Sequence, residues 1–253
     1  MGRQRLRLFM RYVRFMLSTE TITFVFEIIG TVAFALSGVT VALEKRMDLL
    51  GTVILGLCPA IGGGIIRDLV LGIHPPKAFQ DPTYAIVGIV AILIYCLPWV
   101  LDYFEKHHVF YENLLLVTDS IGLGIFTAVG VAAAYNISHN YSMFLYIFVG
   151  VVTGVGGGVL RDTIASVPPY IFVKHFYATA SIIGAVCCVV VWEAAGESTA
   201  IMTCTVIVIA LRLIAAKRRW KLPKPTSDAR IYTRFFKRHI NDADEVEGFN
   251  KFE

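Results

Sequence analysis

Long apolar runs with few charged positions alternate with short polar segments along most of the chain. Seven of these runs are close to the length of about 20 residues that an α-helix needs to cross a bilayer's hydrocarbon core. They cover residues 21–43, 49–73, 83–101, 114–135, 143–167, 172–192 and 199–216. Segments of alternating polarity, which are typical of membrane β-barrels, do not interrupt this pattern. The pattern therefore predicts an all-α membrane protein with seven transmembrane helices.

The two ends of the chain are polar. Residues 1–20 include five arginines and predict a basic amino-terminal leader, either an amphipathic helix on an anionic membrane surface or a partly ordered segment. Residues 217–253 predict a polar cytoplasmic tail, in which a basic cluster beside the membrane precedes a stretch with the composition of a disordered segment.

The distribution of lysine and arginine predicts the orientation of the chain. Nine of these residues lie in the loops after the first, third and fifth spans and in the start of the tail. Six lie on the opposite side, namely Lys77 and the five arginines of the leader. We therefore expect an external amino terminus and a cytoplasmic carboxyl terminus.

Composition excludes several classes of protein. Hydrophobic residues make up 56% of the chain and charged residues 17%, whereas soluble domains have about 25% charged residues. The five cysteines all fall inside predicted spans without C-x-x-C or Cys/His spacing, so we expect buried thiols and neither a metal site nor a cofactor. Sequence motifs of hydrolases, zinc enzymes and nucleotide-binding enzymes are missing. The expected partner is the lipid bilayer rather than a nucleic acid, and we expect no enzymatic activity.

The chain contains an internal repeat. The segment "PAIGGGIIRD" begins at Pro59, and "TGVGGGVLRD" begins 94 residues later at Thr153. In the same way "EIIGTVAFALSG", which begins at Glu27, returns 92 residues later as "DSIGLGIFTAVG" from Asp119. Spans one to three therefore recur as spans four to six. This divides the chain into a first repeat at residues 21–105, a second at 110–195 and a seventh helix at 197–216.

The number of spans in each repeat predicts their relative orientation. Because three is odd, the second copy must enter the membrane from the opposite side, and the two repeats should be related by a pseudo-two-fold axis in the membrane plane. Proteins of this kind place their functional site at the interface of the repeats.

The glycine-rich segments predict helix breaks in spans two and five, because proline removes a backbone donor and glycine weakens a helix. Unwound backbone would have to line a wet cavity or be buried in protein. The carbonyl groups at such a break would suit a cation, and the amide groups would suit a carboxylate. The alternative is a face of small residues for close helix packing. The positions concerned are Pro59, Gly62, Gly63 and Gly64, and Thr153, Gly156, Gly157 and Gly158.

Charged residues lie inside the first, second, fourth and fifth predicted spans. Arg67 and Arg161 each fall about 10 Å from the midplane, on opposite sides of it. Glu27 shares the layer of Arg67, and Asp119 shares that of Arg161, so we expect two layered ion-pair sites. The aspartate after each arginine should either complete its site or cap the second half-helix. The candidate pore and gating residues are Arg67, Arg161, Glu27, Asp119, Asp68 and Asp162.

The doubled G-G-G-x-x-R-D motif resembles the trimeric intracellular cation channel family in its prokaryotic form, over residues 24–215. The resemblance implies homotrimers in a bacterial or archaeal plasma membrane, with one pore in each protomer for K⁺ and Na⁺ and bends at the glycines. It also implies that Arg67 and Arg161 lie beside the pore and take part in gating. Some bacterial relatives are described as transporters of small amino acids such as glycine. A secondary transporter of a small zwitterion is therefore the alternative.

Overall fold

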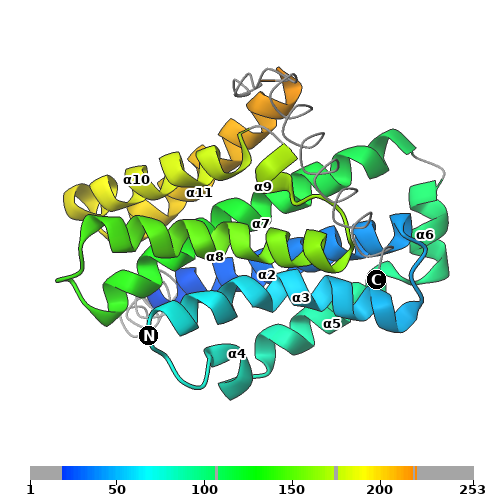
Figure 1. The fold of residues 1–253 in the computed structure, drawn as a ribbon, viewed down its shortest axis with the longest axis horizontal. Helices are drawn as coiled ribbons and strands as arrows, with labels where there is room; N and C mark the ends of the chain where they lie inside the picture. Colours follow the sequence, from blue (N-terminus) through cyan, green and yellow to red (C-terminus); the bar gives the residue numbers. More distant parts are fainter. Residues whose placement is uncertain (1–18, 106–107, 174–175, 219, 221–253) are drawn as a thin grey trace, which may run out of the picture. The chain divides into compact units, whose positions relative to one another are not determined.

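The computed structural model describes residues 19–105, 108–173, 176–218 and 220, and the regular structure among them is entirely helical. The predicted leader and tail therefore lie almost wholly outside the described residues. The helices, drawn in Figure 1, are α2 (Thr19–Glu44), α3 (Leu49–Val70), α4 (Lys77–Gln80), α5 (Thr83–Tyr95), α6 (Pro98–Glu105), α7 (His108–Ile137), α8 (Met143–Ile164), α9 (Tyr170–Val173), α10 (Tyr177–Ala195) and α11 (Glu197–Lys217).

Six of these helices are long and apolar enough to cross a membrane, namely α2, α3, α7, α8, α10 and α11. The third predicted span, residues 83–101, is divided instead into α5, with 13 residues, and α6, with 8. The division falls at Pro98, because proline disfavours helical backbone in the residue before it. The structure thus confirms six predicted spans and shows a shorter apolar helix, α5, at the place of the seventh.

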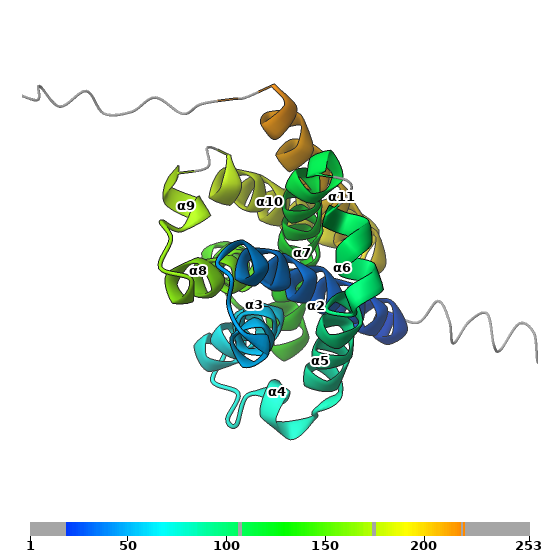
Figure 2. The ribbon, with the colours of Figure 1, turned by 90° about the vertical axis from the view of Figure 1, so that its right-hand side faces the viewer.

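The helices form two equivalent bundles. Helices α2, α3 and α5 contact one another, as do α7, α8 and α10, and the bundles meet where α2 packs on α7 and α3 packs on α8. Seen along the helices in Figure 2, these four lie in the centre, with α5 on one side and α10 and α11 on the other. Helix α11 packs on α7 and α10 and belongs to neither repeat.

The corresponding helices α3 and α8 begin and end in the same manner. The side chain of Asp48 accepts a hydrogen bond from the N–H of Gly51, and that of Ser142 accepts one from Leu145. These caps satisfy backbone donors at the helix start. After the last turns, Gly72 and Ser166 have positive φ angles of 74° and 54° and close equivalent backbone hydrogen bonds. The repeat is thus preserved in local structure as well as in sequence.

The glycine-rich segments do not break their helices, so that prediction was wrong. Helices α3 and α8 continue through all the positions concerned. These positions are Pro59, Gly62, Gly63 and Gly64 in α3, and Thr153, Gly156, Gly157 and Gly158 in α8. The alternative of close helix packing is the one the structure supports, because burial and contact outweigh the low helix propensity of glycine.

A close contact at the glycine triplets joins the backbones of α3 and α8. A Cβ atom on Gly63 would lie 2.3 Å from the carbonyl oxygen of Thr153, and one on Gly157 would lie 2.5 Å from that of Pro59. The hydroxyl of Thr153 is buried and donates to the carbonyl of Val149 in its own helix, at 2.6 Å. Because the two contacts are reciprocal and run in opposite directions along the chain, the pseudo-two-fold axis passes between the two antiparallel helices.

The first glycine of each triplet makes the next contact along this crossing. A Cβ atom on Gly62 would lie 2.5 Å from Cδ1 of Leu160, and one on Gly156 would lie 3.0 Å from Cδ1 of Ile66. Successive helical residues point about 100° apart. The third glycine of each triplet, Gly64 or Gly158, therefore faces away from the crossing.

The crossing predicts different outcomes for neighbouring glycines. Gly63→Ala should lower the free energy of unfolding of the purified protein by about 1–3 kcal/mol, because the new methyl group meets backbone that cannot give way. Gly64→Ala is the matched control, since its Cβ would have Arg67 Nη2 at 3.8 Å as its nearest neighbour. Thermal unfolding of both variants in detergent measures the difference. Equal melting temperatures for the two variants would contradict this account of the crossing.

Candidate functional site

Arg67 lies in the last turn of α3 at the centre of a first cluster, which also contains Glu27, Asp68 and Tyr84. Its Nε atom donates to Oδ1 of Asp68 at 2.9 Å, and its Nη1 atom lies 3.3 Å from Oε1 of Glu27. The arginine side chain is 5% exposed and that of Glu27 is 19% exposed. A buried arginine is stable only with partners, and these carboxylates supply them.

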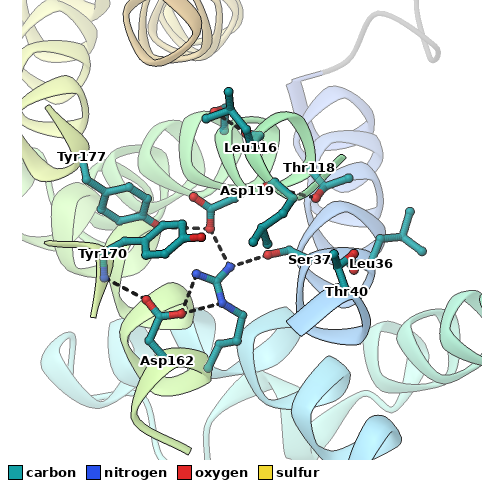
Figure 3. Close-up of polar contacts among 12 residues, drawn as sticks. Leu36, Ser37, Thr40, Leu116, Thr118, Asp119, Asp162, Tyr170 and Tyr177 are labelled. Atoms are coloured by element: carbon teal, nitrogen blue, oxygen red, sulfur yellow. Dashed lines mark hydrogen bonds and ion pairs between the residues drawn. The ribbon is translucent and has the colours of Figure 1, made fainter. Parts of the chain in front are cut away.

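Arg161 occupies the equivalent place in α8, in a second cluster with Asp119, Asp162 and Tyr177. Its Nη1 atom lies 2.7 Å from Oδ1 of Asp119, and its Nη2 atom lies 2.7 Å from Oδ1 of Asp162. The side chains of Arg161 and Asp119 are fully buried. The Arg161 guanidinium also donates to the hydroxyl of Ser37 in α2, so this cluster links the two repeats (Figure 3). The two predicted ion pairs, Arg67 with Glu27 and Arg161 with Asp119, are therefore both present.

The two aspartates beside the arginines complete the ion pairs. Asp68 also accepts a hydrogen bond from the N–H of Lys77 at 2.8 Å, and Asp162 accepts one from Tyr170 at 2.8 Å. Each aspartate thereby ties the end of its transmembrane helix to the short helix that follows, α4 or α9. The alternative prediction, that they cap second half-helices, was wrong because α3 and α8 have no second halves.

Two tyrosines of the clusters were missed in the sequence. The Tyr84 hydroxyl donates to Oε2 of Glu27, and the Tyr177 hydroxyl donates to Oδ1 of Asp119 at 3.3 Å. The tyrosines are 93 residues apart and each precedes an alanine. The repeat continues past the double prolines Pro75–Pro76 and Pro168–Pro169, and following it a few residues further would have found both tyrosines.

Arg212 of α11 was also missed. Its Nη2 atom lies 3.4 Å from Oδ2 of Asp119, and its guanidinium carbon lies 4.7 Å from the ring centroid of Tyr177. The sequence held a signal, since Arg212 is the one charged residue in the predicted span at 199–216. The repeat could not indicate its partner, because α11 has no counterpart in the first repeat.

A pocket of about 40 Å³ adjoins the first cluster and is large enough to admit water. It extends along α3 from Arg67 through Gly64 to Ala60, about 10 Å along the helix. The lining residues are Glu27, Thr31, Ala60, Ile61, Gly64, Arg67, Asp68, Lys77, Ala78, Tyr84 and Phe126. Within the described part of the chain, no group of histidine, cysteine, aspartate and glutamate residues could hold a metal ion.

Comparison with known proteins gives matches over most of the chain. A family model described as "Glycine transporter" matches residues 24–99 and 116–193, which correspond to the two repeats. The chain is 35% identical over 202 residues to the UPF0126 inner membrane protein YadS of Escherichia coli K12, covering 79% of this chain and 93% of that protein. It is 32% identical to membrane protein YvgT of Bacillus subtilis, covering 78% and 93%.

Solved structures with the same fold are TRIC cation channels. One, determined in a study of their conductance, has a TM-score of 0.68 and 36% identity, covering 81% of this chain and 97% of its own. The trimeric intracellular cation channel orthologue from Rhodobacter sphaeroides has a TM-score of 0.71 and 27% identity, covering 79% and 100%. A prokaryotic TRIC channel crystallised in 0.5 M KCl has a TM-score of 0.72 and 25% identity.

The burial of the two arginines predicts unequal effects on stability. Arg161→Ala leaves Asp119 and Asp162 buried without this partner, and we expect it to lower the free energy of unfolding by about 3–5 kcal/mol. Arg67→Ala should lower the free energy of unfolding by less than Arg161→Ala does, because Glu27 adjoins the pocket and can be hydrated. Thermal unfolding of the two variants in the same detergent provides the comparison. A larger loss for Arg67→Ala would refute the assignment of the second cluster as the more deeply buried site.

Proposed function

Because this chain belongs to the trimeric intracellular cation channel family, in its prokaryotic form, we propose that it is a channel for the monovalent cations K⁺ and Na⁺. The chain accounts for nearly the whole length of the channel structures that it matches. It is an integral membrane protein with several apolar helices. An enzymatic role has no support from these relatives.

The observation that carries the proposal is the pocket beside Arg67. It combines two carboxylates with Gly64, whose missing side chain leaves space within the first bundle. In the proposed channel this pocket is one mouth of a pore in each protomer, and Arg67 takes part in gating. The second mouth lies at Arg161, by the equivalence of the repeats.

Carboxylates offset the basic residues of this mouth. Glu27 and Asp68 together bring two formal negative charges, and Arg67 and Lys77 bring two positive charges, so the charged residues that line the pocket sum to zero. An arginine beside a cation pore is compatible with conduction when carboxylates neutralise its field. The ion pairs thus serve two purposes, because they stabilise the buried arginine and reduce its repulsion of K⁺.

The proposed pore is closed in this conformation. Phe126 lines the pocket, and its ring stacks on that of Phe34 with centroids 5.3 Å apart. Beside these rings, the contact of Gly63 with α8 leaves no space between the two helices. Conduction would therefore require a movement of the helices that separates these groups, as two-state gating by packed helices allows.

We further propose a homotrimer in a bacterial plasma membrane, by analogy with the trimeric orthologue and the inner membrane relative. The amino terminus would lie outside and the carboxyl terminus in the cytoplasm, as the loop charges indicate. In this orientation the first cluster faces the outside. The second cluster then lies toward the cytoplasm.

A second candidate function is secondary transport of a small zwitterion such as glycine. It is favoured by the description of the matching family model. The pocket also offers the two charges that a zwitterion needs, with Arg67 available for a carboxylate and Glu27 for an ammonium group. In the proposed channel these charges instead act electrostatically on the permeant cation.

Reconstitution of the purified protein distinguishes the two functions. In planar bilayers the channel should give unitary K⁺ currents whose reversal potential in a KCl gradient follows K⁺. Membranes prepared without protein are the control. Saturable uptake of glycine into proteoliposomes, without unitary currents, would exclude the channel and establish the transporter.

Removal of one carboxylate should reduce the current. Glu27→Gln makes the formal charge of the pocket lining more positive by one unit, and a unit charge at about 4 Å in water is worth about 1 kcal/mol, or roughly a fivefold change in K⁺ occupancy. We expect a several-fold lower K⁺ conductance at low salt and a smaller effect at high salt. Glu20→Gln, an exposed position in the first turn of α2, is the matched control. Equal conductance in both variants would show that Glu27 does not act on the ion.

A further inference from the structure

The two clusters are equivalent in sequence but unequal in space. In the first cluster a Cβ atom on Gly64 would meet nothing closer than Arg67 Nη2 at 3.8 Å. In the second cluster a Cβ atom on Gly158 would lie 2.5 Å from the hydroxyl oxygen of Tyr177. Tyr177 is 1% exposed. Its side chain therefore fills the space that corresponds to the pocket of the first repeat.

The corresponding tyrosine of the first repeat does not fill its bundle. Tyr84 is only partly buried and lines the pocket, although it makes the same hydrogen bond to the acidic residue of its cluster. The bond to a carboxylate therefore does not by itself hold a tyrosine against the glycine. Another group must account for the position of Tyr177.

The second cluster has in addition Tyr170, whose ring packs edge to face on that of Tyr177 with centroids 6.3 Å apart, and it has Arg212. Its guanidinium lies over the ring of Tyr177, at 4.7 Å from the centroid, and its Nη2 atom lies 3.4 Å from Asp119. A cation over an aromatic face attracts it, and more strongly where water is excluded. Arg212 is 3% exposed, and α11 supplies no equivalent residue to the first repeat. The interaction is thus confined to one end of the molecule.

Arg212 also changes the charge of the second cluster. Asp119, Asp162 and Arg161 sum to a formal charge of −1, and Arg212 brings the sum to zero. In the first pocket Lys77 balances Glu27, Asp68 and Arg67 in the same way. The two mouths therefore differ in that the second is filled by Tyr177 and the first is open to water.

We infer that Arg212 is a positioning residue that holds Tyr177 against Gly158, so that the second cluster is the closed gate of the pore and the first cluster is a hydrated entrance. This inference rests on the proposed channel function. The two related repeats then perform different tasks, and the seventh helix is the element that makes them different. Release of Tyr177 from Arg212 opens the second mouth.

Footprinting with hydroxyl radicals tests the position of Tyr177 without any measurement of current. In the full-length protein in nanodiscs, Arg212→Gln should increase the oxidation of Tyr177 at least several-fold while that of Tyr84 stays constant. Arg212→Lys should have a smaller effect, because it keeps the charge and loses the planar group over the ring. Arg218→Gln, at an exposed position beyond α11, is the matched control for the loss of a positive charge. Unchanged oxidation of Tyr177 in Arg212→Gln would overturn the inference.

Single-channel recording tests the consequence for gating. Arg212→Gln should raise the open probability several-fold over the wild type, and in a Tyr177→Ala background it should add little, because both changes vacate the same space. A full additional effect in that background, or an unchanged or lower open probability in the single variant, would overturn the gating role. If the wild type gives no K⁺ current while Tyr177 responds in footprinting, the proposed channel function fails and the contact between Arg212 and Tyr177 stands.

Discussion

The burial of a guanidinium group inside each repeat is the constraint on which the structure depends. An arginine in a membrane-spanning helix needs partners that remain in place, and both Arg67 and Arg161 find one on the next residue of their own helix and one on a neighbouring helix. The neighbouring carboxylate fixes the rotation and depth of α2 or α7 against α3 or α8. Because this arginine–carboxylate pairing occurs in both repeats, it orients the four central helices α2, α3, α7 and α8.

The glycines allow α3 and α8 to pack closely, whereas their sequence suggested helix breaks. Two antiparallel helices related by a pseudo-two-fold axis must cross at that axis, and the crossing is close only if the residues there lack side chains. Gly63 and Gly157 meet this need, while Gly64 leaves space in the first bundle and the space beside Gly158 is filled by Tyr177. One triplet therefore supplies both the contact that joins the repeats and the space that a pore requires, without a break in the helix.

Hydrophobic pattern and repeat predicted most of the architecture, because the spans, the inverted order and the ion-pair layers depend only on length and spacing. The division of the third span at Pro98 and the continuity of α3 depend on tertiary contacts, which local propensity does not contain. Partners within the repeats could be predicted by depth, as Glu27 was for Arg67. Arg212 could not be placed, since no repeated position indicates where α11 packs. Its effect on Tyr177 is also what makes two similar sequences differ in space.

The central claim is that ions pass Gly64 on their way through each protomer. Modification of Gly64→Cys by a positively charged thiol reagent, during recording of K⁺ current, tests it most directly. Gly62→Cys, which faces Leu160 at the helix crossing, and the wild type with its native cysteines are the controls. The account predicts that the reagent blocks the current of Gly64→Cys alone. An undiminished current after complete modification at position 64 would contradict it.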